Sequence, residues 1–280
     1  MSVDILTITN HDRNIFKGKY IYPVVSRRAG GLSLGINLNT NNACNWQCIY
    51  CEIPNLIRGK PEAIDLLKLE GELDYWLNEI INKSFLDQYT DTKTEFKDIA
   101  FSGNGEPTAS KEFGAVAKIL IKKISKFNLN KKIKIRLITN GSYISNPDIQ
   151  KALTSIKKFN PEVWFKIDQV RPEEVMAINQ INLSTNKLKK NLEACLSKCP
   201  TIIQTCLFKI DKKLPEQTSL DAYINFLKPY EKKIKGIHLY SLARPSEQSS
   251  KDKLTRLTQD EIEEIAIKIK VLNIPINIYS

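Results

Sequence analysis

The sequence contains no apolar run near the roughly eighteen residues that a membrane-spanning helix needs. Its first residues, Met-Ser-Val-Asp-Ile-Leu, lack the basic segment, apolar segment and small-residue cleavage site of a secretory signal. We therefore expect a cytoplasmic protein without a membrane partner. Internal repeats, low-complexity segments and linker-like stretches are also absent, so we expect an N-terminal extension over residues 1–31 and one core domain over residues 32–280.

Histidine is scarce, since only His11 and His238 occur, whereas cysteine is concentrated in one place. Three of the six cysteines form Cys44-x3-Cys48-x2-Cys51. Clustered cysteines in a cytoplasmic chain indicate metal binding or catalysis rather than a disulfide framework. Thiolates at such short spacings hold iron–sulfur clusters, and three of them would leave one iron of a cubane open to an outside ligand. A zinc site, which usually has a fourth Cys or His nearby, and a redox dithiol at Cys48 and Cys51 remain alternatives.

Hydrophobic periodicity predicts six strands, each followed by a helix. The strands are expected at residues 32–38, 98–102, 133–138, 163–168, 202–208 and 236–241. The helices are expected over residues 64–84 and 111–127, after the N-cap Asn146 with Pro147 at the first helical position, over residues 183–198, from Ser219, and after the capping box of Thr258 and Glu261. Edge strands are expected near residues 20–26 and 276–279. This order predicts an α/β fold, a partial parallel (β/α)6 barrel with helices outside.

Two polar loops follow predicted strands, at the ends where α/β folds bind ligands. Phe101-Ser-Gly103-Asn-Gly105-Glu106-Pro follows the second strand, and Thr139-Asn140-Gly-Ser follows the third. The glycines allow backbone amides to approach a ligand closely, and Glu106 adds a carboxylate beside them. Both loops are equally consistent with tight turns that need glycine for their backbone angles.

These motifs together resemble those of the radical S-adenosylmethionine (SAM) superfamily. Tyr50 directly precedes the last cysteine of the triplet, and Gly103-Asn-Gly105-Glu106-Pro follows about fifty residues later at a strand end. Ser-Leu-Gly-Ile before the cysteines, Phe-Ser-Gly-Asn-Gly-Glu-Pro-Thr and Leu-Ile-Thr-Asn-Gly are similar to the wyosine-synthase-like branch, whose enzymes rebuild a guanine in tRNA. The matching blocks span roughly residues 32–244.

The resemblance implies a partial barrel of the radical SAM type and a [4Fe-4S] cluster ligated by Cys44, Cys48 and Cys51. The amino and carboxylate groups of SAM would chelate the fourth iron. One electron, from a donor such as flavodoxin or ferredoxin, would cleave SAM to methionine and a 5′-deoxyadenosyl radical that abstracts hydrogen from a substrate.

The resemblance also implies contacts to SAM. Tyr50 would lie beside the adenine, and Asn140 would line the ribose or carboxylate side. Gly103, Gly105 and Glu106 would receive the methionine amino group, a cation that a carboxylate and backbone carbonyls bind.

Lys166 and Asp168 lie two residues apart on the fourth predicted strand, so their side chains share a face. If that face points into the barrel, Lys166 would pair with the SAM carboxylate and Asp168 with a ribose hydroxyl. The alternative is that the two neutralise each other as an internal ion pair. The later strands end in candidates for substrate contact, namely Gln204, Thr205, Tyr240, Ser241 and Arg244.

Other residues are expected to be structural. His238 lies between Ile237 and Leu239, and a single imidazole without a positioned partner is more typical of a hydrogen-bonded core residue than of a catalyst. The wyosine-synthase-like branch has a second cluster built from cysteines upstream of the first motif, but no cysteine precedes Cys44 here. The three later cysteines are expected to be buried thiols rather than ligands, namely Cys195, Cys199 and Cys206.

The net charge of +11 raises the question of a nucleic-acid partner. The densest basic run is expected on the face opposite the site, as an ordinary solvated surface: Lys122, Lys123, Lys126, Lys131, Lys132, Lys134 and Arg136. Basic residues on the site's own side are available for phosphates: Arg27, Arg28, Arg58, Lys60, Arg171, Lys209, Lys212, Lys213 and Arg244. We hypothesise that the substrate is tRNA. The alternatives are an activase or maturase acting on a protein or peptide, a small-molecule radical SAM enzyme, and a metal-binding protein without catalysis.

Overall fold

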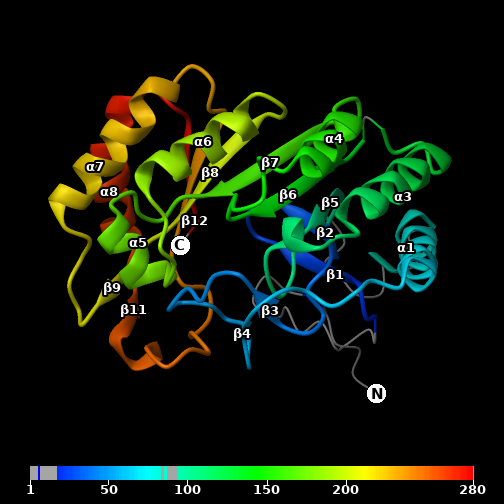
Figure 1. Cartoon of the computed structure of the whole chain (residues 1–280), viewed down its shortest axis with the longest axis horizontal. Coiled ribbons are helices and arrows are strands. Elements are labelled where there is room, and N and C mark those ends of the chain that lie inside the picture. Colours follow the sequence, from blue (N-terminus) through cyan, green and yellow to red (C-terminus); the bar gives the residue numbers. More distant parts are fainter. Residues whose placement is uncertain (1–5, 7–17, 83–84, 87–93, 131, 280) are drawn as a thin grey trace.

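Eight strands form one curved sheet in the order β1-β2-β5-β6-β7-β8-β10-β12 (Figure 1). The computed structural model describes residues 6, 18–82, 85–86, 94–130 and 132–279. Neighbouring strands run parallel, except that β1 and β2 form an antiparallel hairpin. The strands are β1 Ile21–Ser26, β2 Gly31–Ile36, β5 Phe96–Phe101, β6 Lys134–Thr139, β7 Pro161–Lys166, β8 Thr201–Cys206, β10 Gly236–Tyr240 and β12 Ile276–Tyr279.

The helices lie around the outside of this sheet (Figure 1). They are α1 Leu66–Ile81, α3 Phe113–Lys126, α4 Pro147–Ile156, α5 Pro172–Asn179, α6 Thr185–Leu196, α7 Gln217–Leu227 and α8 Gln259–Ile269. Short 3-10 turns are η1 Pro107–Ala109, η2 Lys228–Tyr230, η3 Lys251–Lys253 and η4 Lys270–Leu272. Two small ladders lie beyond the carboxyl ends of the sheet strands: β3 Ala43–Cys44 with β4 Ile57–Arg58, and β9 Phe208–Ile210 with β11 Leu254–Arg256. Within the described part of the chain, no helix has the length and apolarity needed to cross a membrane.

The two faces of the sheet differ in polarity. On β7, Val163 and Phe165 belong to the apolar core, whereas Trp164 and Lys166 line cavities on the concave side. This alternation follows from the two-residue period of a strand. The apolar face is buried under the helices, so the polar face is left to line the lumen of a half-barrel.

The predicted partial (β/α)6 barrel is confirmed: the six predicted strands correspond to β2, β5, β6, β7, β8 and β10. The predicted caps are also present, because the Asn146 side chain accepts from the Asp148 amide and Thr258 and Glu261 form a reciprocal capping box. Residues 276–279 form the predicted edge strand, which pairs parallel with β10. The other predicted edge strand, near residues 20–26, corresponds to β1, which adds one antiparallel strand to the sheet.

Three sequence predictions differ from the structure. Helix α5 lies between the strand predicted over residues 163–168 and the helix predicted over residues 183–198, where the sequence predicts no helix. Helix α7 begins at Gln217 after the N-cap Glu216, because the Ser219 hydroxyl bonds to Glu174 and Arg171 instead of capping the helix. The strand predicted over residues 202–208 ends at Cys206, after which β9 turns away to pair with β11. Much of the predicted extension, residues 83–84 of the first predicted helix, and Lys131 lie outside the described residues.

The basic run around α3 is only partly a solvated surface. The Lys123 side chain is 5% exposed, and its Nζ lies 2.7 Å from Glu70 and 2.5 Å from Asp74 on α1. Lys122 and Lys126 pair with the same two carboxylates. These lysines therefore join α3 to α1, and the expectation of an ordinary solvated face is wrong for Lys123.

Candidate active site

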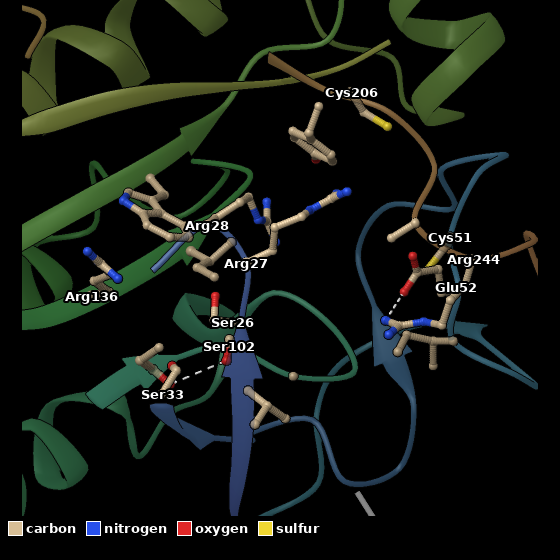
Figure 2. Close-up of a pocket in the computed structure, with 18 of the residues that line it drawn as sticks. Ser26, Arg27, Arg28, Ser33, Cys51, Glu52, Ser102, Arg136, Cys206 and Arg244 are labelled. Carbon is tan, nitrogen blue, oxygen red and sulfur yellow. Dashed lines mark hydrogen bonds and ion pairs between the residues drawn. The ribbon is translucent and has the colours of Figure 1, made fainter. Parts of the chain in front are cut away.

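Two adjoining cavities lie at the carboxyl ends of the parallel strands. One, of about 200 Å³, is lined by residues predicted from the sequence: Cys44, Cys48, Cys51, Gly103, Gly105, Glu106, Asn140 and Lys166. The other, of about 320 Å³, extends along the lumen and includes Tyr50. Arg28, Cys51 and Tyr240 line both cavities. In Figure 2, Arg27 and Arg28 lie between Arg136 on one side and Cys51 and Glu52 on the other.

The three thiols of the motif line the same cavity, and none is in a disulfide. Burial raises the pKa of Cys44 to about 11 and that of Cys48 to about 12. Both are therefore neutral at pH 7, and a metal would have to displace their protons on binding. Among the described residues, no three His, Cys, Asp or Glu side chains are placed to hold one metal ion. The three thiols of a cubane site bind three different irons and need only line one cavity, whereas a single zinc needs its ligands around one point.

Helix α5 fixes one side of the cysteine loop. The Ile49 amide donates to the Ile178 carbonyl (2.9 Å), and the Gln47 amide donates to the Asn179 carbonyl (3.3 Å). The Asn179 side-chain nitrogen lies 3.3 Å from the Cys48 sulfur and 2.8 Å from Asp168 Oδ2. Asn179 is thus a site residue that sequence reasoning missed together with its helix. The only sequence signal for that helix is Pro172 followed by two glutamates, which is typical of a helix N-terminus.

The segment after β10 fixes the other side of the loop. The Ser246 hydroxyl donates to the Ile49 carbonyl (2.7 Å), and the Gln248 amide group donates to the carbonyls of Cys51 (3.2 Å) and Ile53 (3.0 Å). Arg244, a predicted substrate contact, forms an ion pair with Glu52 next to the last cysteine. Contacts from distant parts of the chain therefore set the shape of the loop.

The glycine–glutamate turn packs directly on the segment that precedes the cysteines. A Cβ atom on Gly105 would lie 2.2 Å from the Ala43 carbonyl oxygen, and one on Gly103 would lie 2.3 Å from the Asn37 side chain. Gly103 also has a φ of +146°, which side chains other than glycine rarely adopt. The close packing of the two loops therefore explains on its own why glycine is needed at positions 103 and 105. A contact of these glycines with SAM remains a prediction.

Glu106 lies at the end of this turn and is 2% exposed. Its carboxylate accepts hydrogen bonds from the Thr139 hydroxyl (2.6 Å), the Asn140 amide (2.6 Å) and Thr108. Burial raises the pKa of Glu106, and these donors oppose the rise. The Asn140 side chain in turn donates to Asn45 in the cysteine loop (3.0 Å). Glu106 therefore joins the second and third loops to each other beside the thiols.

We expect a Gly105→Ala substitution to separate the two loops, because the new methyl group meets a backbone carbonyl that cannot rotate away. Overpacking of this kind costs about 1–3 kcal/mol in the free energy of unfolding. Iron incorporated per chain should fall as well, since Ala43 directly precedes the first thiol. Gly114→Ala in α3 is the matched control, because its Cβ meets nothing within 4 Å. Chemical denaturation gives the free energy of unfolding of each variant, and iron analysis gives its iron content. Equal values for the two variants would contradict this prediction.

Lys166 and Asp168 form the internal ion pair that the sequence left as an alternative, with 3.6 Å between Nζ and Oδ2. Asp168 also accepts from the Tyr50 hydroxyl (2.5 Å) and the Cys206 amide (3.0 Å). Burial opposes the charge on Lys166, but Asp168 raises its pKa well above the usual value. Lys166 Nζ lies 4.7 Å from the centre of the Tyr50 ring and lines the smaller cavity. The predicted SAM contacts of these residues are compatible with this placement and remain predictions.

Four of the five candidate substrate residues line a cavity: Gln204, Tyr240, Ser241 and Arg244. Thr205 does not, because it points to the opposite face of β8 and its hydroxyl lies 2.8 Å from the Tyr223 hydroxyl on α7. His238 is buried between the rings of Trp164 and Tyr279, and burial lowers its pKa to about 4. The predicted buried position of His238 is confirmed. The predicted hydrogen bond is not found at Nδ1, which has no partner among the described residues.

The remaining cysteines are not gathered around one point. The sulfur of Cys195, on the buried side of α6, lies 3.3 Å from the Thr201 hydroxyl, and the sulfur of Cys199 lies near the carbonyl of Leu153. Cys206 is on the concave side and lines the larger cavity. Burial raises the pKa of each of these thiols.

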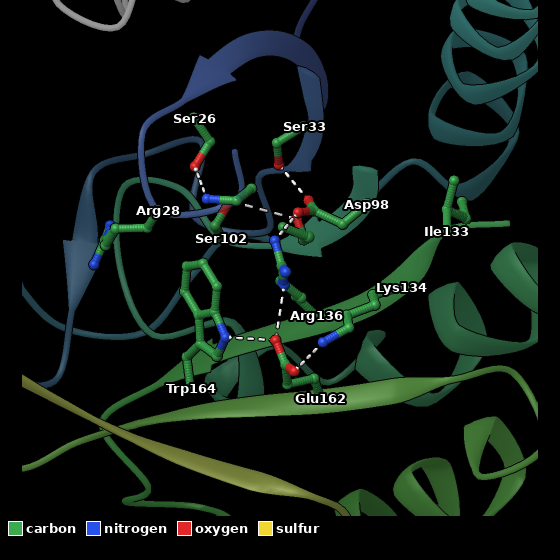
Figure 3. Close-up of polar contacts among 12 residues, drawn as sticks. Ser26, Arg28, Ser33, Asp98, Ser102, Ile133, Lys134, Arg136, Glu162 and Trp164 are labelled. Atoms are coloured by element: carbon green, nitrogen blue, oxygen red, sulfur yellow. Dashed lines mark hydrogen bonds and ion pairs between the residues drawn. The ribbon is translucent and has the colours of Figure 1, made fainter. Parts of the chain in front are cut away.

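A buried ionic network forms the lower part of the lumen (Figure 3). Arg136 pairs with Asp98 and, at 3.0 Å, with Glu162, which also accepts from Lys134 and from the Trp164 indole at 2.9 Å. The Ser33 hydroxyl donates to Asp98 from β2. The expectation that Arg136 is on the solvated face is wrong, because alternation on β6 turns it inward with Lys134.

The fold is that of several solved radical SAM proteins. A radical SAM methyltransferase from Sphaerobacter thermophilus superposes with a TM-score of 0.59 at 10% identity, over 92% of this chain and 68% of that one. Streptococcus suis SuiB gives 0.55 at 12% identity, over 91% of this chain and 51% of the other, and has also been solved with S-adenosylmethionine bound. The hydrogenase maturase HydG of Carboxydothermus hydrogenoformans gives 0.55 at 15% identity, over 87% and 52%. The chain therefore has the half-barrel fold of these proteins.

No family model matches the sequence, and the curated proteins that it resembles match only part of the chain. A UPF0026 protein of Helicobacter pylori is 31% identical over 176 residues, which are 62% of this chain and 49% of that protein. UPF0026 protein slr1464 of Synechocystis is 23% identical over 57% of this chain and 52% of its own length. GTPase Obg of Brachyspira hyodysenteriae is 29% identical over 60% of this chain but only 23% of its own length. The chain thus spans about half or less of these curated relatives, and the wyosine-synthase-like branch remains a prediction.

Proposed function

We propose that the chain is a radical SAM enzyme that holds a [4Fe-4S] cluster at Cys44, Cys48 and Cys51. The observation that supports this most is that the three thiols line one cavity together with the Gly103–Glu106 turn, at the carboxyl edge of a half-barrel. The cluster, reduced by a donor such as flavodoxin or ferredoxin, would supply the electron that cleaves SAM to a 5′-deoxyadenosyl radical.

The chain's own residues would bind and orient SAM in the two adjoining cavities. Lys166 is a buried cation that Asp168 keeps protonated, so it is suited to a carboxylate. The Tyr50 ring packs on Phe208 with 5.1 Å between centroids and offers an aromatic surface for adenine. We assign the amino group of SAM to the turn that Glu106 holds in place, and the ribose side to Asn140 and Asp168.

We propose tRNA as the substrate, because basic side chains lie along the same edge of the molecule. Lys60 follows β4, and Lys212 and Lys213 follow β9; these two strands belong to the two small ladders beyond the carboxyl ends of the sheet strands. None of these three forms an ion pair with a described carboxylate, in contrast to the lysines that join α3 to α1. Unpaired lysines on one edge are suited to phosphates, which they attract in a salt-dependent manner.

Two assays test the two levels of this proposal. The protein, reconstituted anaerobically with iron and sulfide and reduced with dithionite, should release 5′-deoxyadenosine and methionine from SAM. Nucleosides of tRNA from cells with and without the gene should differ by mass spectrometry. An absence of 5′-deoxyadenosine would exclude the enzyme class. Cleavage of SAM with an unchanged nucleoside profile, and with tRNA binding that is weak at every salt concentration, would exclude tRNA alone.

A further inference from the structure

The turn between β1 and β2 places one arginine inside the half-barrel. The turn is tight, because the Ser26 hydroxyl accepts from the Ala29 amide (3.1 Å) and Gly30 adopts a φ of +72°. The Tyr279 hydroxyl on β12, the last strand of the sheet, donates to the Arg28 carbonyl (3.4 Å). The turn therefore connects the two edges of the sheet, and the Arg28 side chain lines both cavities from there.

Arg28 differs from the other cations of the lumen in its partners. Arg136, Lys166 and Arg244 each form an ion pair with a carboxylate. Arg28 forms none with any described carboxylate. Its guanidinium lies over the rings of Tyr240 (4.7 Å) and Trp164 (5.4 Å), and its Nη1 donates to the Gln204 oxygen (3.0 Å). The flat, weakly hydrated guanidinium is suited to such stacking while its remaining N–H groups stay available.

Gln204 supplies the second half of the site. It is 2% exposed and lines the cavity of the three thiols. Its side-chain oxygen is engaged by Arg28, but its nitrogen Nε2 is buried without a hydrogen-bond partner among the described residues. A buried donor without an acceptor is unfavourable, so such a group usually indicates a ligand or an ordered water. A cation without a counter-ion and a donor without an acceptor thus lie side by side.

We propose that Arg28 and Gln204 form a site for an oxyanion of the substrate, either a phosphate or a carboxylate. The guanidinium would donate to one oxygen and Gln204 Nε2 to another, which satisfies both groups with charge-assisted hydrogen bonds. Lys166 remains available for SAM on the adjacent strand β7. The assignment of the oxyanion to the enzyme's substrate rests on the proposed function. The binding of an oxyanion by Arg28 and Gln204 does not depend on it.

The test is calorimetric titration of the cluster-loaded protein with inorganic phosphate or with acetate, at constant ionic strength set by chloride. We expect one saturable site per chain for at least one of the two anions, unchanged by saturating SAM. Arg28→Ala and Gln204→Glu should each weaken binding at least about tenfold. Gln204→Glu keeps the side-chain volume and sets a carboxylate against Arg28, so it removes the free charge without opening a cavity. Lys118→Ala, on the exposed surface of α3, is the control and should bind like the wild type.

The two anions distinguish a phosphate-bearing substrate from a carboxylic acid. Binding of neither anion, equal binding by all variants, or complete displacement of the anion by SAM would overturn the proposal. The last result would assign the site to the SAM carboxylate. Thermal unfolding of each variant separates lost binding from lost folding. Release of 5′-deoxyadenosine by the wild type is measured alongside: its failure would overturn the proposed function, whereas the titration alone decides the anion site.

Discussion

A Cys48→Ala variant is expected to lose its iron and, with it, the cleavage of SAM. The wild type should incorporate about four irons and four sulfides per chain after anaerobic reconstitution. Cys48 is buried, whereas Cys44 and Cys51 are partly exposed. The side chain of Asn179 lies beside the Cys48 sulfur, and Lys166 and Asp168 are close enough to affect the pKa of Cys48. Loss of a group that only orients a ligand costs about 10–100-fold in metal affinity, so loss of the ligand itself should reduce turnover by at least about 100-fold.

Cys195→Ala is the matched control for this prediction. Both cysteines are buried, and burial raises the pKa of each to about 12, but Cys195 lies on α6, with its sulfur next to Thr201 and away from the cavity of the three thiols. Iron and sulfide analysis, the visible absorption of the cluster and release of 5′-deoxyadenosine are measured on both variants. Equal losses in the two would indicate a general folding defect, and a Cys48→Ala protein that keeps its iron would contradict the assigned ligand set.

The positions of the site residues were predictable because they depend on local rules. The thiol spacing is visible in the sequence, and parallel strands with helical crossovers place every following loop at one edge. That is sufficient to bring Cys44, Gly105, Glu106 and Asn140 to one cavity. Caps such as Asn146 were predictable for the same reason, because each involves neighbouring residues only.

What the sequence did not reveal depends on contacts between distant residues. Asn179 is an ordinary polar residue at the end of a short helix until its contacts with Cys48 and Asp168 are known. Ser219 has the residue type of an N-cap, but its hydroxyl is used by Glu174 on another helix. Arg136 was predicted on the solvated face because it ends a dense basic run at a helix C-terminus and the start of the next strand. In a half-barrel the concave face is polar, so period-two alternation alone cannot distinguish the lumen from solvent.

The position of Arg136 leads to the largest expected change in stability. Its side chain is 9% exposed and is paired with Asp98, which is 1% exposed, and with Glu162. Arg136→Met would leave two carboxylates without this partner in the lumen. Removing one member of a buried ion pair costs about 3–5 kcal/mol in the free energy of unfolding, because the remaining charges stay desolvated. Lys134→Met is the matched control: it contacts the same Glu162, but its side chain is 40% exposed, so we expect a loss of about 1 kcal/mol or less.

The pH dependence of this loss distinguishes uncompensated charge from a simple packing defect. Burial already raises the pKa of Asp98, while Lys134 and Arg136 overcome burial and lower that of Glu162. Without Arg136 both pKa values rise, so above pH ~4 the folded variant binds more protons than the folded wild type. The stability of the variant relative to wild type therefore improves as the pH falls toward that value. Urea unfolding is measured at about pH 7.5 and at about pH 5, which both lie above pH ~4. The difference in the free energy of unfolding between variant and wild type should be smaller at the lower pH. A difference that stays constant would mean that Arg136 stabilises the half-barrel by its packing on the Trp164 ring, 4.5 Å away, and not by its charge.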